Sequence, residues 1–522
     1  MTGAAYAPPH RLAAEPLSRS AGRAWLAAAA VLTLCAFVVR CGLFGDPLIH
    51  VDENFYLWVG ERLLRGELPY VDVWDRKPVG LFVLYAAIRL LGGDGIVQYQ
   101  VVATLFAAAT AWVVARIAAP AAGIAGGTAA GVLYLLMIGL AGGAGGQAPV
   151  FYNLFVAAAA WASQRALLGG AAAPAQVRSL GCAAMALVGV AMQLKYTAVF
   201  EGVFLGLVLL WASWRAGEGR AGRVGRTAAD AALWIGLALA PTLAALAWYA
   251  SLGQTQAFVY ANFLSIGARS GASAAELAHR LRNTGELMVG PVLALGLALW
   301  LKPWRRFAGG AEAQGFALLW LAAAVAGYAL FGTYFNHYAL PLIAPLAVCV
   351  APLFAVRERR LGAAAVALML VVGAVANTVS IYEARLKRGG EAQMAQMLAA
   401  IRPRLTNCLY VWNGDSILYH LTGSCAPTRY AFAGHLNLLR ENGAVGVDQA
   451  TEVRRILAGR PSVIVDRLPR AADMNPAVIA IVDAELARAY APAAVIPLKK
   501  ARLVVYERRP EAASAPDRRP SR

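Results

Sequence analysis

Long apolar stretches alternate with short polar ones as far as about residue 381, after which the pattern becomes mixed. A helix needs roughly 20 mostly apolar residues to cross the hydrocarbon core of a bilayer. The pattern therefore predicts a polytopic α-helical membrane region followed by a separate C-terminal domain. About eleven stretches have the character of membrane-spanning helices: 24–43, 95–118, 121–140, 149–167, 178–194, 197–214, 228–252, 286–301, 314–332, 338–356 and 361–381.

A further apolar stretch, residues 79–91, has about 13 residues and lies between Pro78 and the pair Gly92-Gly93. That length favours a helix in the membrane interface over one that crosses. Basic residues favour the same interpretation, because cytoplasmic loops carry an excess of lysine and arginine. If 79–91 does not cross, the following basic residues all fall on one side: Arg11, Arg19, Arg23, Arg116, Arg165, Arg178, Arg215, Arg220, Arg223, Arg226, Lys302, Arg305, Arg306, Arg357, Arg359 and Arg360.

These assignments predict a cytoplasmic N-terminal segment (1–23), a transmembrane domain (24–381) and an exported C-terminal domain (382–510). The last residues, 511–522, are rich in proline, alanine, serine and arginine, which predicts a disordered tail. We expect a multi-pass protein of the bacterial inner (cytoplasmic) membrane. Its N-terminus is expected in the cytoplasm and its C-terminal domain in the periplasm.

Composition agrees with a membrane protein and excludes several other classes. Of the 522 residues, 59% are hydrophobic and 15% are charged, whereas a soluble domain carries about 25% charged residues. The 47 lysines and arginines against 29 acidic residues give a net charge of +18. A nucleic-acid-binding protein can be this basic, but it is not also this apolar. We therefore expect membrane lipids as partners, and no nucleic acid.

The C-terminal region 382–510 has the pattern of a small α/β domain. Its predicted strands are 408–412, 462–466, 494–498 and 502–507, and its predicted helices lie near 391–402, 447–459 and 476–490. Asp415, His420, Arg429 and His435 show no catalytic spacing, so they are expected in loops and at the surface. Cys408 and Cys425 face an oxidising compartment, and the sequence leaves open whether they form a disulfide.

The first predicted outside loop, residues 44–94, gathers many of the charged residues of the chain. Asp52 and Glu53 stand at a predicted helix start, where carboxylates cap the helix and favour its dipole. Residues 53–65 have helical spacing that suits a helix lying on the bilayer surface. Capping and solvation alone would explain these charges. The order of residues is more specific: His50-Val-Asp52-Glu53-Asn-Phe-Tyr56, Gly60, Gly66-Glu67-Leu-Pro69-Tyr70, Asp72 and Trp74-Asp75-Arg76-Lys77-Pro78.

This order resembles the start of the polyprenol-dependent GT-C glycosyltransferases. Within them it is similar to glycosyltransferase family 39, the protein O-mannosyltransferase-like and aminoarabinose-transferase-like group. The specific match covers about residues 48–92, and the later spans are compatible in layout. Two further segments fit the same pattern, Lys195-Tyr196-Thr197 and Tyr334-Phe-Asn-His337-Tyr338-Ala-Leu-Pro341.

The resemblance implies a GT-C membrane fold and a hexosyl- or pentosyltransferase. A polyprenyl-phosphate sugar would be the donor, and an envelope glycan, lipid or protein would be the acceptor, as in lipopolysaccharide biosynthesis or protein O-mannosylation. Transfer would take place on the periplasmic face with inversion. No cofactor is implied beyond the lipid-linked sugar itself.

The chemistry needs a carboxylate that accepts the proton of the attacking hydroxyl, and positive charge at the leaving phosphate. By resemblance, Asp52 matches the catalytic aspartate of the family and would be the general base. Its neighbour Glu53 would cap the helix or hold a basic partner, because successive helical residues point about 100° apart. Lys77 matches the lysine of the Lys-Pro motif and would bind the donor phosphate, with a lysine snorkelling to the interface as the alternative.

Three further residues are candidates for contacts with the donor phosphate. Lys195 lies at the outer end of a predicted span, where an ionisable residue is costly unless it has a function or reaches the interface. His337 stands where relatives often have a lysine or arginine, so its charge would depend on pH. Tyr334 is the third, although at least one of Tyr334 and Tyr338 is expected in the aromatic belt at the membrane surface.

The short outside loop near residues 141–148 departs from the family pattern. Relatives often carry a second acidic residue there, whereas this chain has Gln147, which cannot act as a base. Either the second acid is dispensable, or the acceptor differs. His50, Asp52 and Glu53 could start a divalent metal site, but no recognisable spacing completes it. We therefore predict no metal site and hold a divalent metal as a lesser alternative.

Two other functions fit a polytopic membrane protein. A transporter or flippase of lipid-linked sugars should show internal repeats and charged residues deep in its spans, and the sequence shows no repeat. A structural subunit of an envelope complex would need the loop charges only for capping and solvation.

Overall fold

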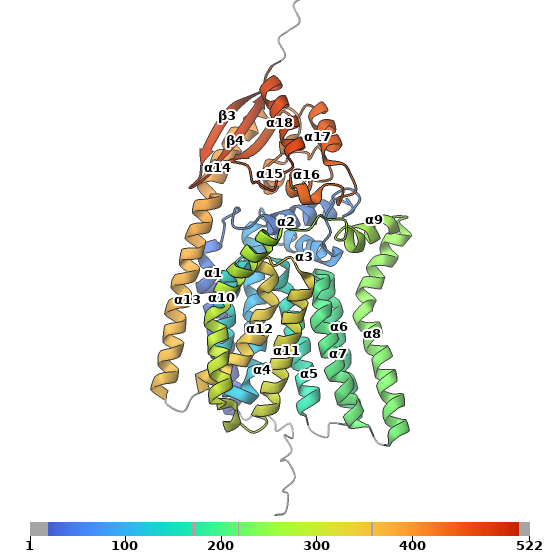
Figure 1. Cartoon of the computed structure of the whole chain (residues 1–522), viewed down its shortest axis with the longest axis vertical. Coiled ribbons are helices and arrows are strands. Elements are labelled where there is room, and N and C mark those ends of the chain that lie inside the picture. The colour runs from blue at the N-terminus through green and yellow to red at the C-terminus, as the bar shows by residue number, and fades with distance from the viewer. Residues whose placement is uncertain (1–18, 170–172, 218, 356–358, 511–522) are drawn as a thin grey trace, which may run out of the picture. The chain divides into compact units, whose positions relative to one another are not determined.

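The computed structural model describes residues 19–169, 173–217, 219–355 and 359–510 (Figure 1). The predicted disordered tail, most of the predicted cytoplasmic segment and Arg357 lie outside these ranges. The described residues form two compact units. Unit 1 takes in the described parts of Met1–Phe44, Lys77–Thr255 and Ala272–Tyr382, and unit 2 those of Gly45–Arg76, Gln256–Gly271 and Glu383–Arg522. The domain boundaries expected from the sequence stay predictions.

Unit 1 is a bundle of helices (Figure 1). Its longest member, α4, packs against α1, α5 and α12, and α6 packs against α5, α7 and α8. The helices of unit 1 are α1 (Arg19–Arg40), α3 (Val79–Arg89), α4 (Ile96–Ile138), α5 (Ala148–Leu168), α6 (Pro174–Leu194), α7 (Val199–Ala216), α8 (Arg220–Ser251), α10 (Ala274–Leu301), α11 (Gly310–Phe331), α12 (Leu340–Val350) and α13 (Arg359–Arg388), of which α13 continues into unit 2.

Nine helical segments within the described ranges are long and apolar enough to cross a membrane. One of them, Ile96–Gly143, has 48 residues. Its helix α4 alone would be about 65 Å long if straight, twice the thickness of the hydrocarbon core. Gly123 breaks it with non-helical angles (φ 69°, ψ 176°). Beyond the break, a Cβ at Gly131 would lie 2.7 Å from the carbonyl oxygen of Ala111, so the two arms fold back on each other.

The two arms of α4 correspond to two of the predicted spans. Helix α5 corresponds to a third, but it is not among the nine segments. Its polar side chains explain the lower hydropathy. Asn153 and Gln164 are buried, and Gln164 donates to the carbonyl of Ile117 at 3.0 Å. The number of membrane crossings stays a prediction, as does the interfacial position of α3, which is an 11-residue apolar helix.

Unit 2 contains a four-stranded sheet in the order β1-β2-β4-β3. The chain passes from β1 through helices to the parallel neighbour β2, and the β4 pairings with β2 and β3 are antiparallel. The small C-terminal α/β domain is thus confirmed. Its elements are α14 (Glu391–Ile401), β1 (Leu409–Val411), α15 (Ile417–Thr422), α16 (Gly434–Asn437), α17 (Gln449–Ala458), β2 (Val463–Leu468), α18 (Pro476–Ala489), β3 (Tyr490–Pro497) and β4 (Arg502–Arg508). Cys408 and Cys425 form a disulfide.

Residues 45–76 of the first outside loop belong to unit 2 and contribute to its core, whereas the rest of the loop belongs to unit 1. Trp74 is 3% exposed and lies in the same apolar cluster as Trp412 and Ile464 of the sheet domain. A buried carboxylate, Glu441, holds two other segments: Arg76 donates to it at 2.8 Å, and Arg269, which follows α9 (Thr255–Val259), also pairs with it. These ion pairs hold together the segments that carry Arg76, Arg269 and Glu441.

Helix α2 (Val51–Leu64) corrects one expectation. Its apolar residues were expected to face the bilayer surface, but Glu53 to Gly60 are all buried within the protein. Phe55 packs against Phe432 (ring centroids 5.3 Å apart), and Trp58 packs against Tyr419 at 5.5 Å. Eight consecutive helical residues point in every direction around the axis, so this part of α2 is enclosed on all sides, and Phe432 and Tyr419 of the C-terminal domain form part of that enclosure.

Candidate functional site

The predicted base, Asp52, lies in the first turn of α2, and the half-buried His50 is the N-cap residue directly before the helix. Carboxylates are favoured at this end, because the unpaired backbone N–H groups give it partial positive charge. Asp52 is half-buried, whereas Glu53 is fully buried. The two neighbours therefore have different environments, and Asp52 is the one that solvent or a ligand can reach.

The start of α2 is held by two arginines from the end of α13. Arg385 donates to Asp46 at 2.9 Å, and Arg388 donates to the carbonyl of Ile49 at 2.7 Å. The same Arg388 guanidinium lies 3.4 Å from Nδ1 of His50. These contacts fix the backbone directly before Asp52.

A second carboxylate of unit 2 interacts electrostatically with Asp52. Asp415 is 9% exposed and accepts a hydrogen bond from the Asn54 amide at 2.9 Å. Burial raises the pKa of Asp415 to about 7; hydrogen bonds from Ile417 and Asn54 oppose this increase, and the charge of Asp52 adds to it. The sequence pattern missed Asp415, which was expected in a surface loop.

His420 and His435 were also expected in surface loops, and both are buried against residues of the first outside loop. His420 pairs with Glu61 of α2. The ring of His435 lies edge-on to Trp74, with centroids 4.7 Å apart. Of the four polar residues expected at the surface, Arg429 is the exposed one.

The candidates for phosphate binding lie in unit 1, whereas Asp52 and Glu53 lie in unit 2. Lys77 is half-buried and directly precedes Pro78, the residue before α3. A Cβ at Gly80 would lie 2.6 Å from the Cβ of Gln193, so the first turn of α3 packs on the last turn of α6. Gly80 is three residues after Lys77, and Gln193 is two residues before Lys195. The fold therefore brings these two lysine-bearing segments together.

Lys195 also lies beside the segment that carries His337. The lysine is 7% exposed, and its Nζ lies 3.7 Å from the centroid of the Tyr338 ring. The His337 ring is 4.6 Å from the same ring. Tyr334 lies elsewhere: its hydroxyl donates to the carbonyl of Ala329 at 3.3 Å, and its ring packs against Tyr328. These contacts link the segments of Lys77, Lys195 and His337 to one another. The Tyr334 side chain has other neighbours.

An arginine that the sequence analysis did not select holds the segment before His337. Arg280 of α10 lies 3.7 Å over the ring of Phe335 and donates to the carbonyl of Thr333 at 2.9 Å. It also pairs with Glu276 one turn earlier. Arg280 therefore adds a cation to this part of unit 1.

The glycine-rich loop that lacks the second acid is held by Arg40 and Tyr85. The Arg40 side chain is buried and donates to the carbonyls of Gly143 (2.8 Å) and Gly145 (2.6 Å). Tyr85 donates to the carbonyl of Gly146 at 2.6 Å. Among the residues that the structure describes, no group of three or more histidine, cysteine or acidic side chains is placed to hold a metal ion.

A buried acid of unit 1, Glu201 of α7, is also missing from the sequence-based set. It is 4% exposed and accepts a hydrogen bond from the Trp320 indole at 2.8 Å. Together with Thr197 and Tyr338 it lines a small crevice. An ionisable residue within an apolar stretch was the signal that could have identified it.

Comparison with known proteins finds similarity in structure alone: no family model and no curated sequence matches. The apo structure of ArnT from Cupriavidus metallidurans, an aminoarabinose transferase, is 16% identical with a TM-score of 0.62, covering 93% of this chain and 98% of that chain. ArnT bound to undecaprenyl phosphate is 15% identical (TM-score 0.58; 92% and 98% covered). The oligosaccharyltransferase AglB from Archaeoglobus fulgidus, in complex with an inhibitory peptide and a dolichol-phosphate, is 10% identical (0.51; 86% and 70%). The chain therefore has the GT-C fold.

Proposed function

We propose that this chain is a membrane glycosyltransferase that moves a hexosyl or pentosyl group from a polyprenyl phosphate to an acceptor of the cell envelope. The observation that carries the proposal is the likeness in fold to ArnT over nearly the whole of both chains. ArnT and AglB have been solved with undecaprenyl phosphate and a dolichol-phosphate, respectively. A shared fold that accommodates a polyprenyl phosphate favours such a donor here. The transporter and structural-subunit alternatives gain no support from these matches.

In the proposed reaction, the acceptor hydroxyl attacks the anomeric carbon of the donor. The new carbon–oxygen bond forms as the bond to the phosphate oxygen breaks, and the electron pair leaves with the polyprenyl phosphate. Asp52 accepts the proton of the hydroxyl, and the single displacement inverts the anomeric centre. The half-buried position of Asp52 at a fixed helix start supports this role, because it leaves the carboxylate accessible beside the partial positive charge of the helix N-terminus.

Positive charge would stabilise the departing phosphate. Lys77 and Lys195 are the main candidates, because the packing of Gly80 on Gln193 brings their segments together. His337 would add charge when protonated. Tyr334 is a weaker candidate, since its hydroxyl bonds to Ala329. We further propose that the reaction takes place at the periplasmic face of the inner membrane, where the first outside loop is expected.

Purified full-length protein in lipid nanodiscs, supplied with labelled polyprenyl-phosphate sugars and envelope extract, tests this function. We expect release of polyprenyl phosphate and a glycosylated acceptor that mass spectrometry identifies. Movement of intact lipid-linked sugar across sealed vesicles, without any cleavage of the donor, would instead support a transporter. Failure to cleave any donor of a broad panel would contradict the proposal.

A further inference from the structure

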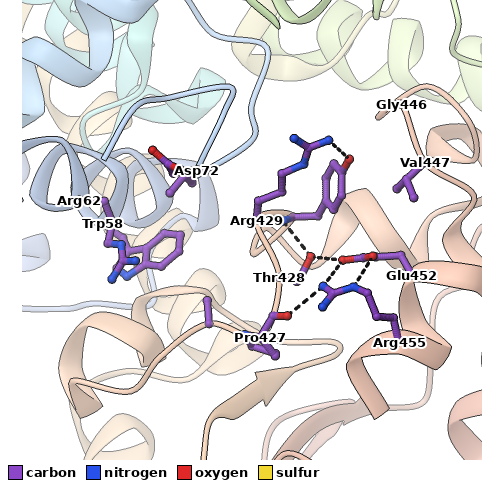
Figure 2. A pocket seen from close by; sticks show the side chains of 13 residues that line it. Trp58, Arg62, Asp72, Pro427, Thr428, Arg429, Gly446, Val447, Glu452 and Arg455 are labelled. Atoms are coloured by element: carbon purple, nitrogen blue, oxygen red, sulfur yellow. Dashed lines mark hydrogen bonds and ion pairs between the residues drawn. The ribbon is translucent and has the colours of Figure 1, made fainter. Parts of the chain in front are cut away.

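Unit 2 contains a cavity of about 510 Å³ that the proposed chemistry does not use (Figure 2). One wall comes from α2 and the loop that follows it, and the other from two segments of the sheet domain, near residues 426–430 and 446–455. A cavity of this size holds a small organic ligand rather than a few waters. Its lining includes the side chains of Arg62, Asp72, Thr428, Arg429, Tyr430, Glu452 and Arg455.

Part of this lining is a fixed network of hydrogen bonds. Glu452 is 8% exposed and accepts from the Thr428 hydroxyl at 2.5 Å. Arg455 donates to both oxygens of Glu452 at 2.6 and 2.8 Å and to the carbonyl of Pro427 at 3.0 Å (Figure 2). The charges of Glu452 and Arg455 therefore compensate each other. Because these side chains are already held by hydrogen bonds, less conformational entropy is lost when a ligand binds against them.

Arg429 differs from the other cations of the cavity. Arg62 is paired with Glu67 at 2.6 Å, and Arg455 is paired with Glu452. Arg429 donates to the hydroxyl of Tyr430 at 2.8 Å and lies over its ring, and within the described ranges it forms no ion pair with a carboxylate. A guanidinium has five N–H donors, so most of those of Arg429 remain available to an anion.

Asp72 provides the complementary group on the opposite wall (Figure 2). Its Oδ2 accepts a hydrogen bond from the backbone N–H of Leu68 at 2.7 Å, which fixes the carboxylate, and the residue is exposed. A carboxylate has about four acceptor positions, so it can also bind hydroxyl groups of a ligand. Arg429 and Asp72 together suit a ligand that has an anionic group and several hydroxyls.

The cavity shares a rigid element with the proposed base. Trp58 and Arg62 line it and lie six and ten residues after Asp52 in the same helix. At 1.5 Å per residue, they are about 9 and 15 Å from Asp52 along the axis of α2. An extended ligand held in the cavity could therefore reach the start of α2.

We infer that this cavity binds the acceptor of the transferred sugar, and that the acceptor is a saccharide bearing an anionic group, phosphate or carboxylate. Arg429 binds the anionic group, and Asp72 binds sugar hydroxyls. The fixed wall of Glu452 and Arg455 shapes the cavity. The assignment of this ligand as the acceptor rests on the proposed glycosyltransferase function, whereas the binding of an anionic saccharide does not.

Binding to full-length protein in nanodiscs tests the inference, with three probes: a neutral trisaccharide, its phosphorylated form and its uronate-containing form. At least one anionic probe should bind about tenfold or more tightly than the neutral one, and the better of the two identifies the anionic group. Arg429→Gln should weaken binding of that probe by about 10- to 100-fold and remove the preference. Asp72→Asn should weaken the binding of all three probes. Arg454→Gln, an exposed arginine outside the cavity, is the matched control and should change nothing.

Equal binding of the neutral and anionic probes, or unchanged binding by Arg429→Gln, would overturn the inference. Transfer assays separate this failure from failure of the proposed function. If wild-type protein transfers sugar and Arg429→Gln leaves the acceptor KM unchanged, the cavity is not the acceptor site, although the enzyme stands. If no donor is cleaved but an anionic probe binds through Arg429, the saccharide site stands, and both the glycosyltransferase function and the acceptor role fail.

Discussion

Asn54 and Asp415 are joined by a hydrogen bond of 2.9 Å, although 361 residues separate them in the sequence. Asn54 lies two residues after Asp52 in α2, and Asp415 precedes α15 of the sheet domain. The C-terminal domain therefore supplies a buried carboxylate directly behind the helix that carries the proposed base. Asp415 is thus an acidic group from a distant part of the sequence that interacts electrostatically with Asp52.

Asp415→Asn should change how stability depends on pH. The folded state raises the pKa of Asp415 from 3.8 to about 7, so folded protein binds more protons than unfolded protein between these values. The contribution of Asp415 to the free energy of unfolding is therefore fully present below about pH 3.8, and it is lost as the pH rises through 7. Asn cannot ionise, so the variant should equal wild type near pH 4 and be more stable at pH 8, by roughly 4 kcal/mol at most.

Thermal unfolding of the full-length protein from pH 4 to 8, followed by tryptophan fluorescence, measures this effect. Asp473→Asn is the matched control, because Asp473 is exposed. An identical pH slope in wild type and Asp415→Asn would show that Asp415 is not buried as described.

Glu441→Gln should destabilise unit 2. Burial alone would raise the pKa of Glu441, but the hydrogen bond from Arg76 and the charges of Arg76 and Arg269 outweigh burial and lower it to about 2. The stability from this carboxylate is therefore present above about pH 4.5 and is lost as the pH falls through 2. Removing one partner of a buried pair leaves uncompensated charge, at a cost of about 3–5 kcal/mol.

Thermal unfolding at pH 7 measures the loss of stability in Glu441→Gln. Glu286→Gln serves as the control, because its pair with Arg282 is 3.7 Å long and both side chains are about two-thirds exposed. We expect the control to change stability by less than about 1 kcal/mol. A Glu441→Gln protein as stable as this control would refute the role of the carboxylate.

Lys195→Ala should weaken use of the lipid donor, if Lys195 contacts its phosphate. A hydrogen bond to a charged group is worth about 1.5–3 kcal/mol, so kcat/KM for the donor should fall by about 10- to 100-fold. Tyr338→Phe keeps the ring under Nζ and should stay within about twofold of wild type. Steady-state assays over a range of donor concentrations measure both, with the exposed Lys500→Ala as control. Unchanged kcat/KM in Lys195→Ala would remove this lysine from the site.

Reducing the Cys408–Cys425 disulfide should destabilise the sheet domain. The bond closes a loop with a sequence separation of 17, which corresponds to about 3 kcal/mol of loop entropy. The double variant Cys408→Ser/Cys425→Ser should unfold at lower temperature than wild type in the absence of reductant. Cys41→Ser, at a free and exposed cysteine, should have no such effect. Equal unfolding temperatures for the double variant and wild type would contradict the pairing.

Local patterns were enough to predict much of the fold. Helix α6 and strand β4 lie close to their predicted ranges, because a span or a strand is defined by consecutive residues. The contacts of α2 were not predictable in this way. An amphipathic pattern indicates an apolar face, but it does not tell whether lipid or protein covers that face. The burial of Phe55 by Phe432 depends on residues far away in the chain.

The same limit applies to the candidate site. Asp52 and Lys77 were found because they lie in a recognisable motif. Asp415, Arg40 and Glu201 have no such motif, and their importance comes from burial and partners that only folding creates. The anionic-saccharide cavity combines residues 58–73 with residues 426–455, so no continuous stretch of sequence could indicate it.

Single-turnover transfer by Asp52→Asn tests the central claim most directly. Wild-type and variant protein would be loaded with a labelled polyprenyl-phosphate sugar that wild type uses, and the rate of glycoside formation would be measured after acceptor is added. Loss of a general base costs about 100- to 10,000-fold, so transfer should slow by at least about 100-fold while donor binding is retained. Asp473→Asn should transfer at the wild-type rate. Transfer by Asp52→Asn at the wild-type rate would contradict the account.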